Sequence, residues 1–348
     1  MKKKATKHTQ QILLSLLQEN KKQQHKTLTL SNLGLVGDEP PLQQLSEYTW
    51  LETLSFTNLE GDLKETPNGL RVLPEGLPTS LRHLDCSGGY LQEFEIKDLS
   101  PIRHLKNLEK FYAEGNQLQD LSPLASLGQL EMLDLTDNKL EDISPLRHLG
   151  KLRELNLSVN QIQDCAPLSH LKALQFLNLN NNGIQELTGL ETLHQLERLF
   201  IANNRIRSLA PLAGLAQLKE LYASKNRISQ VDALATLPQL TYVNLKYNFV
   251  AEVSALRDLP IFDTFEFDIH YNPITNLPWF KAYNRDVSQP MSQFVPEQPL
   301  PNFEKIYELF TSLQKENILL AQQLAQGQGW DKATISALAD FFLKRAER

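Results

Sequence analysis

Several features that would direct a functional assignment are scarce in this chain of 348 residues. It has two cysteines, which argues against a secreted disulfide scaffold and favours a reducing, cytoplasmic compartment. Asp and Glu (41) outnumber Lys and Arg (35), and a net charge of −6 disfavours nucleic acid as the main partner, because phosphate binding requires a clustered positive field. No apolar run approaches the roughly 18 residues of a membrane span, so we expect no membrane partner.

The first residues carry two short patterns that need a separate interpretation. The basic start "MKKKATKHTQQ" is interpreted as a solvated tail in preference to a binding arm. The apolar run "ILLSLL" has six residues, which is shorter than the roughly 7–15 of a secretory signal, and no small-residue cleavage site follows. Residues 8–22 place Ile12, Leu13, Leu16 and Leu17 on one helical face. We therefore predict an N-terminal helical cap over 1–27, with a membrane-surface helix as the alternative.

Catalytic motifs are also missing. The chain has no G-x-S-x-G, H-E-x-x-H or C-x-x-C motif, and no phosphate-binding G-x-x-x-x-G-K-[S/T] loop. Cys86 and Cys165 fall at positions that other coils fill with leucine or isoleucine, so both are predicted to be core residues. Asp120, Asp142 and Asp164 recur once per repeat, which indicates a structural role. We expect no catalytic residue, cofactor or metal, and hence no enzyme.

What the chain has in abundance is a repeat of 22 residues, L-x-x-L-x-L-x-x-N-x-L-x-x-L-x-x-L. Its L-x-L part has period two and predicts a short strand, and its L-x-x-L-x-x-L part predicts a 3₁₀-like return. Each coil can bury its leucines only against its neighbours, so the units should stack as parallel strands. Seven uninterrupted units begin at Leu108, Leu130, Leu152, Leu174, Leu196, Leu218 and Leu240.

Polar residues recur within the coils at fixed places. The asparagine of each unit is predicted to turn inward and to satisfy backbone groups of the loop. In the returns, Ser122 and Ser144 are predicted to cap a short helix whose first position is proline. Outside the regular block two looser coils carry Leu59 and Gly89 at the asparagine position, and we expect ten or eleven coils in total. The asparagines are Asn116, Asn138, Asn160, Asn182, Asn204, Asn226, Asn248 and, after a stretched last coil, Asn272.

These motifs resemble the leucine-rich repeat superfamily, in the 22-residue class shared by bacterial internalins and a protein phosphatase-1 regulatory subunit. The pattern "N-x-L/I-x-D-L/I-x-P-L" at 116–124 and 138–146 carries the resemblance, which covers about 28–280. The edge segments 27–37 and 267–278 are also similar to the repeat domains of bacterial Roco proteins, although no GTPase domain follows. The resemblance implies an α/β solenoid, a curved horseshoe with a parallel sheet on its concave face.

The segments after the solenoid have a different composition. Residues 281–302 are rich in proline and are predicted to be a linker. Residues 303–348 contain two helical patterns, around Phe310 and around Phe341. These helices either cap the last coils or form a separate partner-binding or self-associating module. An enzyme with its chemistry in 281–348 is a further alternative, although no usual catalytic grouping occurs there.

Function is expected on the non-leucine face of the strands, where aromatic residues gather on coils four to seven of the regular block. Exposed aromatic rings with an arginine among them are typical of protein interfaces. Phe200 and Tyr222 are predicted to touch, as are Arg198 and Glu220. The predicted contact residues are Phe176, Arg198, Phe200, Glu220, Tyr222, Tyr242 and Tyr247.

The sequence therefore predicts a non-enzymatic module that binds a protein or peptide on its concave sheet. The alternative is a bacterial effector or surface factor that acts on host proteins, as the resemblance to internalins implies. The identity of the partner and the oligomeric state are left open.

Overall fold

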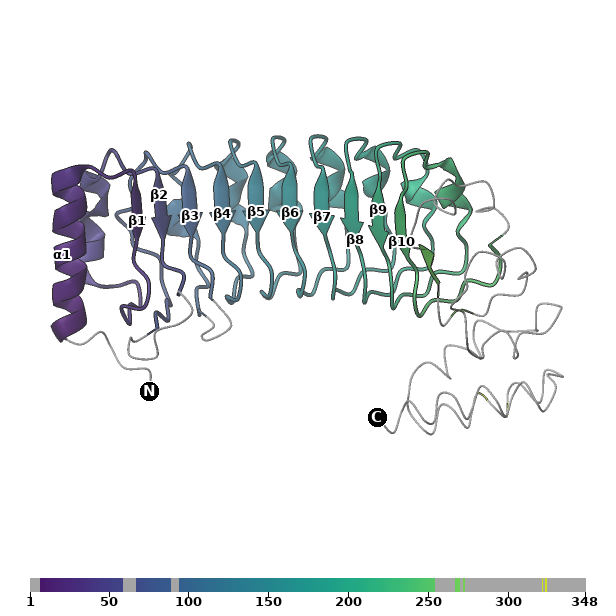
Figure 1. Cartoon of the computed structure of the whole chain (residues 1–348), viewed down its shortest axis with the longest axis horizontal. Coiled ribbons are helices and arrows are strands. Elements are labelled where there is room, and N and C mark those ends of the chain that lie inside the picture. The colour runs from purple at the N-terminus through teal and green to yellow at the C-terminus, as the bar shows by residue number, and fades with distance from the viewer. Residues whose placement is uncertain are drawn as a thin grey trace.

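The structure is a computed structural model that describes residues 7–58, 67–88, 94–253, 267–269, 272, 321 and 323. An α-helix, α1 (Lys7–Gln23), is followed by eleven short strands in one curved sheet, whose spatial order is the order of the chain (Figure 1). Every strand pairing is parallel. The strands are β1 (Thr27–Thr29), β2 (Thr53–Ser55), β3 (His83–Asp85), β4 (Lys110–Tyr112), β5 (Met132–Asp134), β6 (Glu154–Asn156), β7 (Phe176–Asn178), β8 (Arg198–Phe200), β9 (Glu220–Tyr222), β10 (Tyr242–Asn244) and β11 (Phe267–Asp268).

The register of the sheet follows the leucine spacing. Leu155, Leu177 and Leu199 are aligned on three successive strands and have no accessible surface. Leucines of the loops and returns bury against the same core, because each coil covers the apolar face of the next. The predicted parallel solenoid is confirmed.

The repeated asparagines turn inward, as predicted, and each ties two coils together. The Asn182 carboxamide oxygen accepts a hydrogen bond from the Ile162 amide of the preceding coil at 2.9 Å. Its nitrogen Nδ2 donates to the carbonyl of Leu157 in that same coil and to the carbonyl of Leu179 in its own coil. One half-buried side chain thereby satisfies loop backbone groups that would otherwise be unpaired.

Returns on the far side of the core are 3₁₀ helices, most of them with proline near their start. The predicted serine caps are wrong, since Ser122 and Ser144 are the first residues of their helices and their side chains do not cap. Asp120 and Asp142 act instead, each accepting the serine backbone N–H at 2.8 Å. The helices are η1 (Pro40–Glu47), η2 (Ser100–Ile102), η3 (Ser122–Ser126), η4 (Ser144–His148), η5 (Ala166–His170), η6 (Leu190–Thr192), η7 (Ala210–Leu212) and η8 (Asp232–Thr236).

At the N-terminal end α1 lies beside β1, and its residues Leu13 and Leu17 are buried in the common core (Figure 1). Asn20 of this helix accepts a hydrogen bond from the Trp50 indole at 3.0 Å. The predicted linker 281–302 lies outside the described residues, as do Leu59, Gly89 and all of 303–348 except two helical positions, 321 and 323. Among the described helices, none has the length and apolar character needed to cross a bilayer.

Candidate functional site

The strands display their non-leucine side chains on the face opposite the core. In each three-residue strand the middle side chain is buried and the two flanking side chains point outward. Neighbouring returns lie farther apart than the roughly 4.8 Å that separates neighbouring strands. The solenoid therefore curves with its strands on the inside, and we call this strand side the concave face. Its two columns are Lys110, Met132, Glu154, Phe176, Arg198, Glu220 and Tyr242, and Tyr112, Asp134, Asn156, Asn178, Phe200, Tyr222 and Asn244.

Four rings form a continuous row on β7 to β10, called the aromatic ladder: Phe176, Phe200, Tyr222 and Tyr242. Successive ring centroids are 5.3, 4.3 and 4.5 Å apart, and the Phe200 and Tyr222 planes differ by only 6°. The predicted contact between Phe200 and Tyr222 is confirmed. The rings were predicted to be exposed, but they are half-buried because each covers its neighbour.

Stacking determines which part of each ring can meet a ligand. Where two rings stack, their faces are turned toward each other and their edges toward the concave face. The Arg198 guanidinium lies over the Phe176 ring, 4.9 Å from the ring centroid. Arg198 and Glu220 stand in register on neighbouring strands, but among the described residues they form no ion pair. Instead, Glu220 accepts a hydrogen bond from the Tyr222 hydroxyl at 3.2 Å.

Tyr247 lies at the margin of the concave face, in the turn after β10. Its φ of +58° is the left-handed conformation that the residue before the asparagine adopts in every coil of the regular block. It therefore lies outside the two strand columns that hold the rings of the aromatic ladder. The structure brings the other six predicted contact residues together on β7 to β10.

A second group on the concave face was missed by sequence reasoning. Five carboxylates, called the acidic face, lie on the coils of β3 to β6: Asp85, Glu114, Asp134, Asp137 and Glu154. The ring of Tyr112 stands in register between Asp85 and Asp134. Asp85 comes from an irregular coil outside the 22-residue block, so its alignment with Asp134 requires the strand register, which only the structure provides.

The carboxylates of the acidic face influence one another electrostatically. Partial burial, followed by the charges of Asp134, Asp137 and Asp85, raises the pKa of Glu114. Burial and the charges of the neighbouring carboxylates likewise raise the pKa of Tyr112. These shifts indicate a locally negative potential over this half of the concave face.

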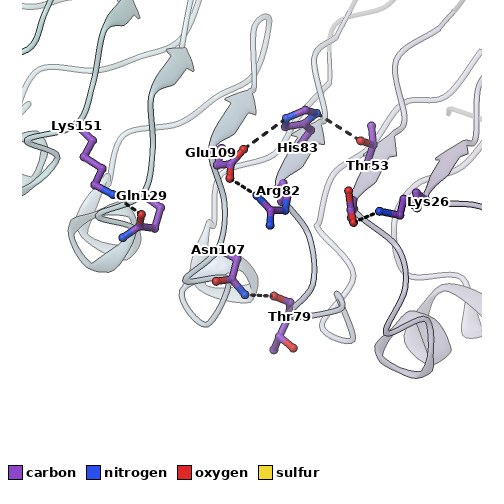
Figure 2. A network of polar contacts seen from close by, with 10 residues as sticks. Lys26, Thr53, Thr79, Arg82, His83, Asn107, Glu109, Gln129 and Lys151 are labelled. Atoms are coloured by element: carbon purple, nitrogen blue, oxygen red, sulfur yellow. Dashed lines mark hydrogen bonds and ion pairs between the residues drawn. The ribbon is translucent and has the colours of Figure 1, made fainter.

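A neighbouring column, at the margin where the strands begin, holds charges that neutralise one another. Figure 2 shows Arg82 and His83 both directed toward Glu109, with the Arg82 contact at 2.5 Å. Lys219 makes the same kind of pair with Glu197 at 2.7 Å. Such exposed pairs contribute at most about 1 kcal/mol each, and we assign them a structural role.

The described residues offer little for chemistry. Burial raises the pKa of the Cys165 thiol to about 12 and raises that of the Cys86 thiol well above its ordinary value, so neither is a nucleophile at neutral pH. Within the part of the chain that the structure describes, no group of three His, Cys, Asp or Glu side chains could hold a metal ion.

Comparisons with known proteins agree with this fold. The family model "Leucine Rich repeats (2 copies)" matches four overlapping stretches, 106–148, 128–170, 150–192 and 172–216. Among curated proteins, none is similar enough to count as a match.

Solved structures similar to this chain come from bacteria and plants. An internalin of Listeria monocytogenes, inlF, is 23% identical over 78% of this chain and 84% of its own, with a TM-score of 0.59. Internalin C2 of the same organism is 37% identical over 48% of this chain and 74% of its own, with a TM-score of 0.47. The ectodomain of the Arabidopsis thaliana receptor kinase GASSHO1/SCHENGEN3 is 22% identical over 69% of this chain and 29% of its own, with a TM-score of 0.58.

Domains of this fold are typically non-enzymatic and generally mediate protein–protein interactions. The repeat pattern, the family model and the parallel solenoid agree with one another. The chain therefore belongs to the leucine-rich repeat superfamily.

Proposed function

We propose that this chain is a non-enzymatic recognition module that binds a protein or peptide on its concave face. The observation that carries the proposal is the aromatic ladder, four adjoining rings on one open sheet with an arginine stacked on its first ring. The contact residues that we propose are Phe176, Arg198, Phe200, Glu220, Tyr222, Tyr242 and Tyr247.

The fold itself does not require rings at these positions. Asn156, Asn178 and Asn244 occupy the same column as Phe200 and Tyr222, and their coils pack in the same way. Tyrosine and arginine are enriched among the residues that dominate binding energy, and a tyrosine immobilises few torsions for a large contact area. A row of rings that stability does not demand therefore supports a role in binding.

The plant ectodomain with this fold was solved in complex with CASPARIAN STRIP INTEGRITY FACTOR 2. That complex shows that a similar solenoid can present a binding surface, and by analogy it supports a protein or peptide ligand here.

We further propose that the chain works in a reducing, cytoplasmic compartment. Its two cysteines, Cys86 and Cys165, are both unpaired and buried, which suits a protein that never meets an oxidising environment. Cell fractionation with an antibody against the chain tests this, and recovery in the culture medium would contradict it.

Affinity capture with the intact chain, followed by mass spectrometry, tests the proposed function. The partner should be lost with Phe200→Ala/Tyr222→Ala, because truncating hot-spot side chains typically costs 2 kcal/mol or more each. The matched control is Phe200→Tyr/Tyr222→Phe, which preserves both rings and should retain the partner. Equal capture by the alanine variant, folded by circular dichroism, would refute the aromatic ladder as the docking site.

A further inference from the structure

We propose that the acidic face binds an arginine- or lysine-rich segment of the same partner that docks on the aromatic ladder. This inference rests on the proposed function and adds the chemistry of the ligand. It follows from the charge, the register and the spacing of the residues on β3 to β6.

The centre of the acidic face combines two kinds of group that bind cations. Asp85, Tyr112 and Asp134 are aligned on three adjacent strands, so a ring lies between two carboxylates. An arginine side chain can stack on a tyrosine ring while its N–H groups donate to carboxylates on either side. Among the described residues, no cation of this chain stacks on the Tyr112 ring.

The negative charge of these aspartates is not needed by the fold. Asp85 and Asp134 each accept a hydrogen bond from the backbone N–H two residues later, at 3.0 and 2.9 Å. In other coils Asn156, Asn178 and Asn244 accept the equivalent bond through a neutral carboxamide, at 3.2, 3.0 and 3.1 Å. Because asparagine suffices for the turn, the charge at 85 and 134 is available for another role.

The acidic face also differs from the charged margin beside it. At that margin Arg82 is paired with Glu109 and Lys219 with Glu197. In contrast, no carboxylate of the acidic face forms an ion pair with another described residue, and Lys110 is the one lysine or arginine in the two concave columns of β3 to β6. Asp85, Asp134 and Glu154 of the acidic face lie in these columns, and three carboxylates against one ammonium leave a surplus that a cationic ligand can neutralise.

The spacing of the two groups constrains the ligand. Tyr112 on β4 and Phe176 on β7 are three strands apart, or roughly 14 Å at the usual strand spacing. An extended peptide covers that distance with about four residues. We therefore expect a ligand whose basic segment lies about four residues from an apolar segment, with the basic part over β3 to β6.

A selection experiment with the full-length chain tests this. The probe is a displayed library of random dodecapeptides, and the bait is the unmodified chain, Asp85→Asn/Asp134→Asn or Phe200→Ala/Tyr222→Ala. A fourth bait, Glu141→Gln/Glu186→Gln, removes the same charge from exposed loop positions and serves as the control. The Asp→Asn variant keeps an oxygen that can accept the turn hydrogen bond. The other variants alter only exposed or half-buried side chains. Thermal melting of each variant checks that it folds.

The unmodified chain and the loop control should enrich Arg and Lys relative to the unselected library, and the Asp→Asn bait should not. A selected peptide should bind the Asp→Asn variant at least tenfold more weakly and the loop control within twofold. Neutral peptides that depend on Phe200 and Tyr222 would overturn this inference and leave the proposed function intact. Basic peptides that bind without Phe200 and Tyr222 would count against the aromatic ladder and would overturn the inference that one partner binds both groups. Equal losses in both charge variants, or no selected peptide at all, would overturn the inference.

Discussion

At the scale of single residues, adjacent polar positions in a coil have different tasks. Asn182 is held inside the loop by hydrogen bonds to two coils, whereas Asn181 adopts a left-handed conformation with φ of +56°. Sequence reasoning found the first position because asparagine recurs there without a break. It did not find the second, since the column holds Gly115, Asp137, Val159, Asn203, Lys225 and Tyr247, which share a backbone angle and no chemistry.

Replacing Asn182 with leucine should lower the free energy of unfolding by roughly 1–3 kcal/mol, because the Ile162 amide and the Leu157 carbonyl lose their partner. Urea denaturation followed by circular dichroism measures this. Gln185→Leu, an exposed change three residues away, is the control and should alter stability by less than about 0.5 kcal/mol. An unchanged midpoint for Asn182→Leu would contradict the bridging role of the asparagine.

Val159 is under backbone strain that a single substitution can relieve. Its φ is +57°, and a β-branched side chain is strongly disfavoured there. We expect Val159→Asn to raise the free energy of unfolding by about 1 kcal/mol. The reverse change one coil on, Asn181→Val, should lower it by a similar amount. If both changes shift the thermal midpoint in the same direction, strain at this column is not the cause.

At the scale of elements, the returns are short helices, and an aspartate two residues upstream holds the start of η2 to η5. The pattern D-L/I-x-P was visible in the sequence, and the recurrence of Asp120 and Asp142 correctly indicated a structural role. Assigning the cap to serine was wrong, because the choice between neighbouring acceptors depends on local backbone angles. In the looser second coil, Asn68 takes the asparagine role and binds the Leu33 and Leu35 amides, which no 22-residue alignment could locate.

The cap at the start of η2 should make a pH-dependent contribution. Hydrogen bonds from the Ser100 side chain and backbone N–H lower the pKa of Asp98 below its ordinary value of 3.8. A folded-state pKa below the unfolded one means that the stabilisation is present above about pH 4 and is lost as the pH falls through the folded value. Carboxyl NMR titration of Asp98 should give a midpoint below that of an unfolded peptide. Ser100→Ala should move this midpoint upward, and no movement would disprove the cause.

At the scale of the whole molecule, each described coil makes its main contacts with the coils beside it. Leucine spacing was sufficient to predict the parallel solenoid, because every regular coil buries the same leucine positions against its neighbours. The aromatic ladder was also predicted, since Phe176, Phe200, Tyr222 and Tyr242 follow from counting within the repeat. The acidic face was not, because Asp85 lies in an irregular coil whose register with the regular block the sequence leaves open.

Removal of one complete coil, residues 152–173, should leave a folded protein. After the deletion Asn182 replaces Asn160 as the acceptor for the Leu140 amide, so every remaining loop keeps its asparagine partner. Small-angle scattering should show a particle shorter by about 5 Å, the spacing of one strand. Deletion of half a coil, residues 152–162, is the control and should unfold the chain. A full-coil deletion that also unfolds would show coupling beyond nearest neighbours.

The asparagine bridges all point the same way along the chain. Each one completes the loop of the coil before it, through an amide 20 residues upstream in the regular block. A coil emerging from the ribosome therefore has a loop N–H without its asparagine acceptor until the following coil has been synthesised. Co-translational assembly of this protein must lag one turn behind the nascent end, and a chain stalled at any point exposes one incomplete loop at its growing tip.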